Sequence, residues 1–189
     1  MKTKKTTIII IFIILLPFLT AAQWVSYNID GSGFRVEFPQ KATNTCVNPT
    51  EWEVCLTCES SMFTYDFRYN KTSITGSKPN DKEIEEILLS AIETYASERN
   101  FHIKRNEPIN LKDWENGGKA LQIEMETFGL VHESTNLEGT TTTVICRSHK
   151  CRVKAFYYET HIFVLAVYSS PELPPLKTVL KFWNSLKKQ

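Results

Sequence analysis

The stretch "HIFVLAVYS" at residues 161–169 restricts the possible folds more than any other part of the sequence. Its apolar residues follow one another without alternation, whereas a strand with one solvent-facing side carries polar residues at alternate positions. Such a strand is stable where other elements cover both of its faces. We therefore predict a sheet in which 161–169 is a central strand covered on both sides.

Other stretches predict further strands, several of them half-buried. Residues 62–69 ("MFTYDFRY") place four aromatic side chains on one face and polar side chains on the other. Because the loops between the later strands are short, we expect antiparallel neighbours. The predicted strands besides 161–169 are 23–29, 33–39, the region around 52–58, 62–69, 119–127, 140–146 and 151–158.

Two amphipathic helices are predicted, one between the strands and one at the C-terminal end. Asn80 with Glu83 three residues later has the pattern of an N-terminal cap for a helix over 78–100. Its apolar stripe consists of Ile84, Ile87, Leu88, Ala91, Ile92 and Tyr95, and that of the second helix, within 174–189, consists of Leu176, Val179, Leu180, Trp183 and Leu186.

The order of strands, helix, strands and helix predicts an α+β fold, with a mainly antiparallel sheet packed by two helices. The chain begins with three lysines and a twelve-residue apolar run, Ile8–Leu19, followed by Thr20-Ala21-Ala22. This layout is typical of a secretory signal peptide, and the run is shorter than the roughly 20 residues that span a bilayer. We expect cleavage after Ala22, which leaves 23–189 as one domain in the periplasm or outside the cell, with no stable membrane span.

Charge and motifs exclude several classes of function. Cleavage leaves 19 basic and 21 acidic residues, so the net charge of −2 does not indicate nucleic acid or an acidic membrane as a partner. The sequence contains no phosphate-binding loop, nucleotide fingerprint or GxSxG motif, and its four histidines lack metal-ligand spacing. We therefore expect no catalytic residue, no metal site and no cofactor, and we do not expect an enzyme.

The order of several motifs resembles a known family. These motifs are "FRVEFP", "YDFRY" leading into the long helix, the "NGG" turn at 116–118, "VKAFYY", "HIFVLAVYSSP" and a terminal helix with "FWNSL". Together they resemble the PsbP-like superfamily, which includes an extrinsic photosystem II subunit, a Ran-binding nuclear import factor and exported bacterial proteins. The resemblance implies an α/β/α sandwich and a role in protein interaction or assembly, and it transfers no functional residue.

Five cysteines remain after cleavage, and "CLTC" at 55–58 raises the question of their chemistry. A redox dithiol needs its first thiol at a helix N-terminus, but the surrounding residues favour a strand. In a strand, residues three apart face opposite sides, so Cys55 and Cys58 would point away from each other. A zinc site is the second alternative, with Cys55, Cys58, Cys146, Cys151 and the intervening His149 as candidate ligands.

We favour the interpretation that cysteines form disulfides, because an exported protein lies in an oxidising compartment. Cys146 and Cys151 flank a four-residue loop between two predicted strands, and a hairpin there would bring them into bonding range. Cys46 precedes a turn, and its expected partner is Cys55 in preference to Cys58. One odd thiol is left over, either buried or available for pairing with another molecule.

These observations lead to one expectation for function and one alternative. We expect an exported, non-catalytic protein-interaction or assembly module of the cell envelope, with a partner that the sequence does not identify. The alternative is a small-molecule or metal-binding protein that uses a cleft between sheet and helix.

Overall fold

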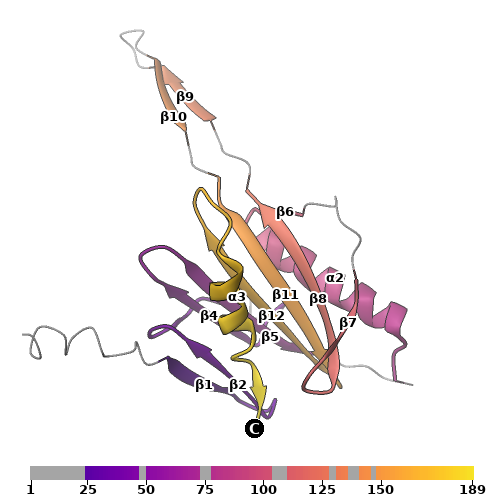
Figure 1. Cartoon of the computed structure of the whole chain (residues 1–189). Coiled ribbons are helices and arrows are strands. Elements are labelled where there is room, and N and C mark those ends of the chain that lie inside the picture. The colour runs from indigo at the N-terminus through magenta and orange to yellow at the C-terminus, as the bar shows by residue number, and fades with distance from the viewer. Residues whose placement is uncertain are drawn as a thin grey trace, which may run out of the picture.

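A computed structural model describes residues 24–46, 50–72, 78–103, 110–127, 131–135, 141–145 and 148–189 of the 189-residue chain (Figure 1). The helices are α2 (Asp81–Glu98) and α3 (Leu176–Trp183). The strands are β1 (Val25–Ile29), β2 (Phe34–Phe38), β3 (Thr43–Asn44), β4 (Val54–Glu59), β5 (Thr64–Lys71), β6 (His102–Ile103), β7 (Lys112–Trp114), β8 (Gly118–Glu126), β9 (Val131–Thr135), β10 (Thr141–Ile145), β11 (Lys150–Tyr158), β12 (His161–Ser169) and β13 (Lys187–Lys188).

The main sheet has the order β3-β4-β5-β12-β11-β8-β6, with β7 also paired to β8, and its pairs are antiparallel. The predicted central strand is confirmed, since β12 lies between β5 and β11 and is buried from His161 to Val167. Strands β9 and β10 pair with each other outside the main sheet, and Figure 1 shows them projecting past its upper end.

Different layers cover the two faces of the main sheet. On one face, α2 packs over a buried cluster that includes Leu88, Ile92, Val153 and Val164. The other face is covered by α3 together with a second sheet of order β1-β2-β13. The predicted α+β class is therefore confirmed. The second outer layer differs from a simple helical layer, because residues 187–188 form β13 and pair with β2.

Helix α2 forms as its sequence predicts. The Asn80 side chain accepts hydrogen bonds from the backbone N–H groups of Lys82 and Glu83, and the Glu83 carboxylate accepts from the Asn80 N–H. Both interactions satisfy groups that a helix start leaves without partners. Just beyond the other end, Asn100 adopts a positive φ of 55°, a conformation that asparagine tolerates better than most residues.

Helix α3 is shorter than predicted, and only part of its apolar stripe is buried. Val179 and Trp183 face the sheet, and the Trp183 indole N–H donates to the Leu165 carbonyl at 3.1 Å. Leu176 and Leu180 are 48% and 40% exposed, so their predicted burial is wrong. The helix ends at Trp183 because the chain then turns into β13. No helix in the described ranges has the length and apolarity required to cross a membrane.

Candidate functional site

Charged and hydroxyl-bearing side chains meet between α2 and the sheet, around the fully buried Asp66 of β5. The Thr57 hydroxyl donates to one carboxylate oxygen of Asp66 at 2.5 Å, and the Tyr95 hydroxyl donates to the other at 2.9 Å. The Arg99 guanidinium lies 3.0 Å from the same carboxylate. One buried negative charge on β5 is therefore satisfied by a residue of β4, a residue of α2 and the residue that directly follows α2.

A second arginine extends this group of side chains, which we call the Asp66 cluster: Thr57, Asp66, Arg68, Tyr95, Glu98 and Arg99. Arg68 is 2% exposed and lies 3.8 Å from Asp66 and 3.6 Å from Glu98. Burial raises the pKa of the Tyr95 phenol well above its ordinary value, and the Asp66 charge raises it further. Burial also raises the pKa of Glu98, while Arg68 opposes that shift.

The Asp66 cluster fixes where α2 lies on the sheet, because each removed interaction leaves a buried charge or hydroxyl without its partner. This cluster is not predicted by the sequence pattern, because the alternation in 62–69 is typical of a strand whose polar face is exposed to solvent. The sequence contains only a weak indication of it. Asp66 and Arg68 are opposite charges two residues apart in a predicted strand, and Tyr95 is a polar-tipped member of the apolar stripe of the helix.

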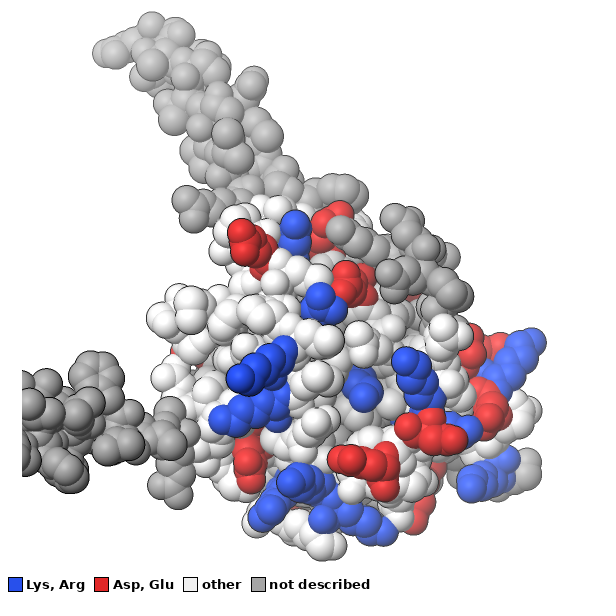
Figure 2. All heavy atoms as spheres, in the orientation of Figure 1, with Lys and Arg blue, Asp and Glu red and all other residues white. Residues whose placement is uncertain are grey.

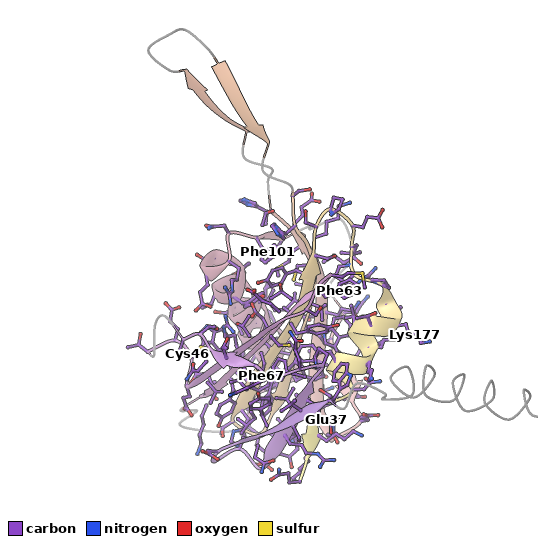
Figure 3. All side chains as sticks on the ribbon, turned by 90° about the vertical axis from the view of Figure 1, so that its left-hand side faces the viewer. Glu37, Cys46, Phe63, Phe67, Phe101 and Lys177 are labelled. Carbon is purple, nitrogen blue, oxygen red and sulfur yellow. A yellow bond between two sulfur atoms is a disulfide. The ribbon has the colours of Figure 1, made fainter. Side chains whose placement is uncertain are left out.

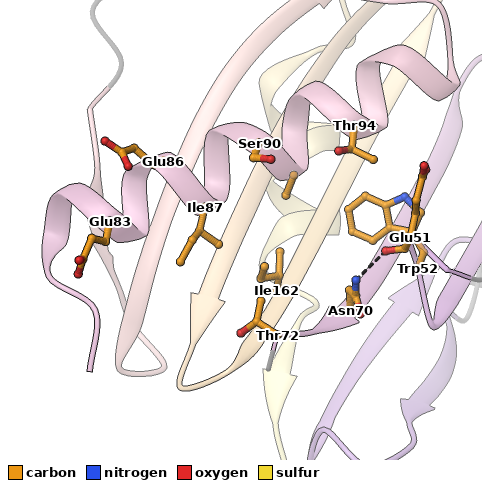
Figure 4. A pocket seen from close by; sticks show the side chains of 11 residues that line it. Glu51, Trp52, Asn70, Thr72, Glu83, Glu86, Ile87, Ser90, Thr94 and Ile162 are labelled. Carbon is orange, nitrogen blue, oxygen red and sulfur yellow. Dashed lines mark hydrogen bonds between the residues drawn. The ribbon is translucent and has the colours of Figure 1, made fainter. Parts of the chain in front are cut away.

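Beside this cluster, α2 and the sheet enclose a groove of about 560 Å³, shown in Figure 4. Its apolar part consists of Trp52, Ile87, Ala91 and Ile162. Its polar lining includes carboxylates, hydroxyls and one amide, from Glu51, Asn70, Thr72, Glu83, Glu86, Ser90 and Thr94. The helical members recur at intervals of three and four residues, so they form one face of α2 adjacent to its buried stripe.

Local hydrogen bonds hold the walls of the groove. The Asn70 side chain donates to the Glu51 carbonyl at 2.7 Å, and the Glu53 N–H donates to the Tyr69 carbonyl at 2.9 Å. Ile162 pairs with Asn70 in the sheet, opposite the helical wall. Trp52 is only 3% exposed, so its ring is packed into the α2-side core. The walls of the groove are thus a helix and residues that are hydrogen-bonded to the sheet.

The charge of the groove is negative. Glu51, Glu83 and Glu86 line it, whereas no lysine, arginine or histidine is among its described lining residues. Lys82 lies 3.9 Å from Glu86, but both side chains are mostly exposed, so this pair neutralises little of the charge. The groove therefore offers an apolar floor with carboxylates around it, which suits an occupant that carries both apolar and basic groups.

The structure answers the question raised by "CLTC". Cys46 and Cys55 form a disulfide, with an S–S distance of 2.02 Å, as predicted. Cys55 belongs to the core on the α2 side and Cys58 to the core on the opposite side, which confirms that the two point apart across β4. Cys58 is a buried free thiol, and the predicted odd cysteine is therefore found inside the protein.

The predicted bond between Cys146 and Cys151 is corrected by the structure. Cys151 is a free thiol with no exposed surface, and it lies in the core beneath α2. The prediction assumed that 140–146 and 151–158 are hairpin partners. Instead β10 pairs with β9, and β11 pairs with β8 and β12, so the assumed hairpin does not form. Cys146 itself and the predicted cleavage residue Ala22 lie outside the described residues.

The described residues contain no group of three or more His, Cys, Asp or Glu side chains arranged to hold a metal ion. No protein-family model and no curated protein matches the chain. Among solved structures, the chain is similar to the solution structure of cyanobacterial PsbP (CyanoP) from Synechocystis sp. PCC 6803. The TM-score is 0.51 and the sequence identity 9%, and the match covers 90% of this chain and 95% of that one. The chain therefore has a PsbP-like fold, as the resemblance in its sequence implies.

Proposed function

We propose that this protein is an exported, non-catalytic protein-interaction module that binds a segment of a partner protein in the groove along α2. Export is supported by the signal-peptide layout of residues 1–22. An envelope or secreted protein is the partner class that such a location provides. The observation that carries the proposal is the groove itself, a preformed apolar trough with an acidic rim.

The shape and chemistry of the groove indicate the kind of segment. A trough of about 560 Å³ is large enough for a few side chains but is open along one side, which favours a chain segment over an enclosed small molecule. Apolar side chains of the partner would contact mainly Ile87 and Ala91, since Trp52 and Ile162 are only 3% and 7% exposed. Lysine or arginine side chains beside them would face the rim carboxylates of Glu51 and Glu86.

A binding role is also supported by the chemistry of the groove lining. The polar side chains there are carboxylates, hydroxyls and an amide, and the described lining contains no cysteine or histidine to serve as a nucleophile or a base near neutral pH. Glu98, whose pKa is raised by burial, is held by Arg68 within the Asp66 cluster. These groups are suited to recognition and to holding α2 in place.

A peptide selection tests the proposal. Phage-displayed random peptides are selected on residues 23–189, and the affinity of enriched peptides is measured by fluorescence anisotropy. We expect peptides that combine apolar residues with lysine or arginine. Glu51→Lys combined with Glu86→Lys should weaken them by at least about tenfold, because two attractive charges become repulsive. Glu83 is left unchanged, since it caps the helix.

A second pair of variants tests the groove without changing its charge. Ala91→Trp fills the apolar floor and should abolish binding, whereas Ser97→Trp adds the same side chain at an exposed position of α2 outside the groove and should leave binding unchanged. Peptides that bind equally to all these variants would contradict the proposal. So would selection that yields no peptide while a small molecule raises the melting temperature.

A further inference from the structure

The most exposed large apolar side chains of the described residues lie on segments that meet on the opposite side of the sheet from the groove. In the described residues, four large apolar side chains stand out by their exposure: Met62 at 69%, Leu176 at 48%, Leu180 at 40% and Val25 at 37%. Single exposed apolar residues are common, but a cluster of them marks a surface that another body covers.

Ring contacts connect the segments that carry these residues. The centroids of the Trp24 and Tyr65 rings are 6.2 Å apart. Phe63, which follows Met62 in the chain, also contacts Tyr65, with ring centroids 6.4 Å apart. The Lys181 ammonium of α3 lies 4.4 Å above the Trp24 ring. The start of β1, the loop before β5 and α3 therefore adjoin. We call this surface the α3 face: Trp24, Val25, Met62, Phe63, Leu176, Lys177, Leu180 and Lys181.

Helix α3 presents both leucines and lysines to solvent. Leu176 and Leu180 are one helical turn apart, and Lys177 and Lys181 follow them with the same spacing, all of them exposed. Figure 3 shows Lys177 on the outer side of α3, and Figure 2 shows uncharged surface beside that helix. Exposed leucines interleaved with lysines, next to a tryptophan, are typical of segments that lie on an anionic lipid surface.

The order of the chain brings the same surface close to a bilayer. Only residues 20–23 separate the apolar run that ends at Leu19 from Trp24. Five Cα–Cα steps reach at most about 18 Å. While the predicted signal peptide is inserted in the membrane, Trp24 therefore cannot move farther than this from the apolar segment. The Trp24 end of the α3 face would therefore lie near the bilayer for as long as the predicted signal peptide stays attached.

From these observations we propose that the α3 face binds peripherally to a membrane surface that contains anionic lipid. The leucines and Trp24 enter the headgroup region, and Lys177 and Lys181 contact lipid phosphates. The net charge of −2 after cleavage conceals this local positive charge. The proposal does not depend on the groove, which lies on the other side of the sheet, and a bound membrane would leave the groove open.

Vesicle flotation tests the proposal on residues 23–189. The vesicles contain phosphatidylcholine alone or with 30% phosphatidylglycerol. We expect binding to the anionic vesicles only, with a loss of at least about fivefold when salt rises from 50 to 500 mM. Leu176→Gln with Leu180→Gln, and separately Lys177→Glu with Lys181→Glu, should each lower binding at least about tenfold.

Two controls make the result decisive. Lys78→Glu with Lys82→Glu changes the net charge by the same amount on the α2 side and should leave flotation unchanged. Because the substituted residues are exposed, unfolding midpoints of all variants should match the parent. Absence of flotation, equal binding by all variants, or a dimer in solution that dissociates in the leucine variant would overturn the proposal, the last outcome identifying a second copy as the occupant.

Discussion

The two faces of β5 are buried to the same degree but are built from opposite chemistry. Tyr65, Phe67 and Tyr69 face α3 and the small sheet, where they pack among other aromatic rings. Asp66 and Arg68 face α2, where they need a hydroxyl, a phenol and charges from other elements. Figure 3 shows Phe67 within the packed interior of the molecule.

This difference indicates how each layer is held. Aromatic packing depends on area and shape, and it requires no charged or hydrogen-bonding partner. The Asp66 cluster depends on direction, because a shift of α2 would leave buried charges without partners. The α2 side is thus held by directional polar interactions as well as by packing, and it carries the groove. The α3 side tolerates exposed leucines at its outer surface.

Substituting adjacent residues of β5 is the strongest test of this contrast. Asp66→Ala should reduce the free energy of unfolding by about 3–5 kcal/mol, because Arg68 and Arg99 lose their buried partner. Phe67→Ala should cost a similar amount, about 3–5 kcal/mol, through a cavity. Guanidinium unfolding combined with Tyr95→Phe separates the two mechanisms.

Tyr95→Phe should be strongly non-additive with Asp66→Ala, since both changes remove the same hydrogen bond. It should be additive with Phe67→Ala, whose side chain lies on the other face of the sheet. A loss below about 1 kcal/mol for Asp66→Ala would show that the cluster does not hold α2.

The disulfide is the next largest contribution on the α2 side. It links Cys46 to Cys55 and closes a short loop that carries two groove residues, Glu51 and Trp52. Replacing both cysteines with serine should lower the unfolding free energy by about 2–3 kcal/mol in the chain-entropy model. Peptide affinity should also fall, because the wall of the groove becomes less ordered in the free protein. Unchanged affinity would assign the disulfide to stability alone.

A pH effect is expected from the α3 side. Burial lowers the pKa of His161, and the charge of Lys71 lowers it further. The imidazole Nδ1 is hydrogen-bonded to the Tyr69 hydroxyl at 3.0 Å. The unfolded chain therefore binds a proton at His161 more readily than the folded protein does. Stability from this residue is fully present above about pH 6.5 and is lost as the pH falls through the folded pKa.

Urea unfolding of the parent protein and of His161→Phe between pH 7.5 and pH 5 measures this effect. The decline of unfolding free energy with acidification should be shallower in the variant. Parallel curves for the two proteins would exclude His161 as the source of the decline.

The smallest expected change concerns Tyr157, at the end of β11. The residue is only 3% exposed, and its buried hydroxyl has no hydrogen-bond partner among the described residues. Tyr157→Phe removes an unsatisfied polar atom, so the unfolding free energy should stay the same or rise by roughly 0.5–1 kcal/mol. A loss of more than about 1 kcal/mol in thermal or urea unfolding would reveal a partner for this hydroxyl.

Sequence patterns predicted the framework because each rested on local chemistry. Three local patterns specify structure within a few residues: the continuous apolar run of β12, the capping residues Asn80 and Glu83, and the short spacing of Cys46 and Cys55. The PsbP-like fold was recognisable from the order of these motifs, and the structural comparison confirms it.

The sequence-based predictions were wrong where the structure depends on contacts between elements that are far apart in the sequence. Asp66 looked solvent-facing because alternation does not show that a helix will cover the second face of a strand. The burial predicted for Leu176 was wrong because the apolar stripe of a helix does not show how much of the helix surface the sheet will cover. The hairpin expected between Cys146 and Cys151 was replaced by a pairing of β10 with β9. The groove was equally hidden, because α2, β12 and the residues before β4 form it only after folding.

Nuclear magnetic resonance of labelled methyl groups most directly tests the claim that two separate binding surfaces lie on opposite faces of the sheet. A selected peptide should shift the methyl signals of Ile87 and Ile162 and leave Leu176 and Leu180 unchanged. Bicelles containing phosphatidylglycerol should produce the reverse pattern. Peptide-induced shifts at the two leucines without shifts at the two isoleucines would contradict the assignment of partner binding to the groove.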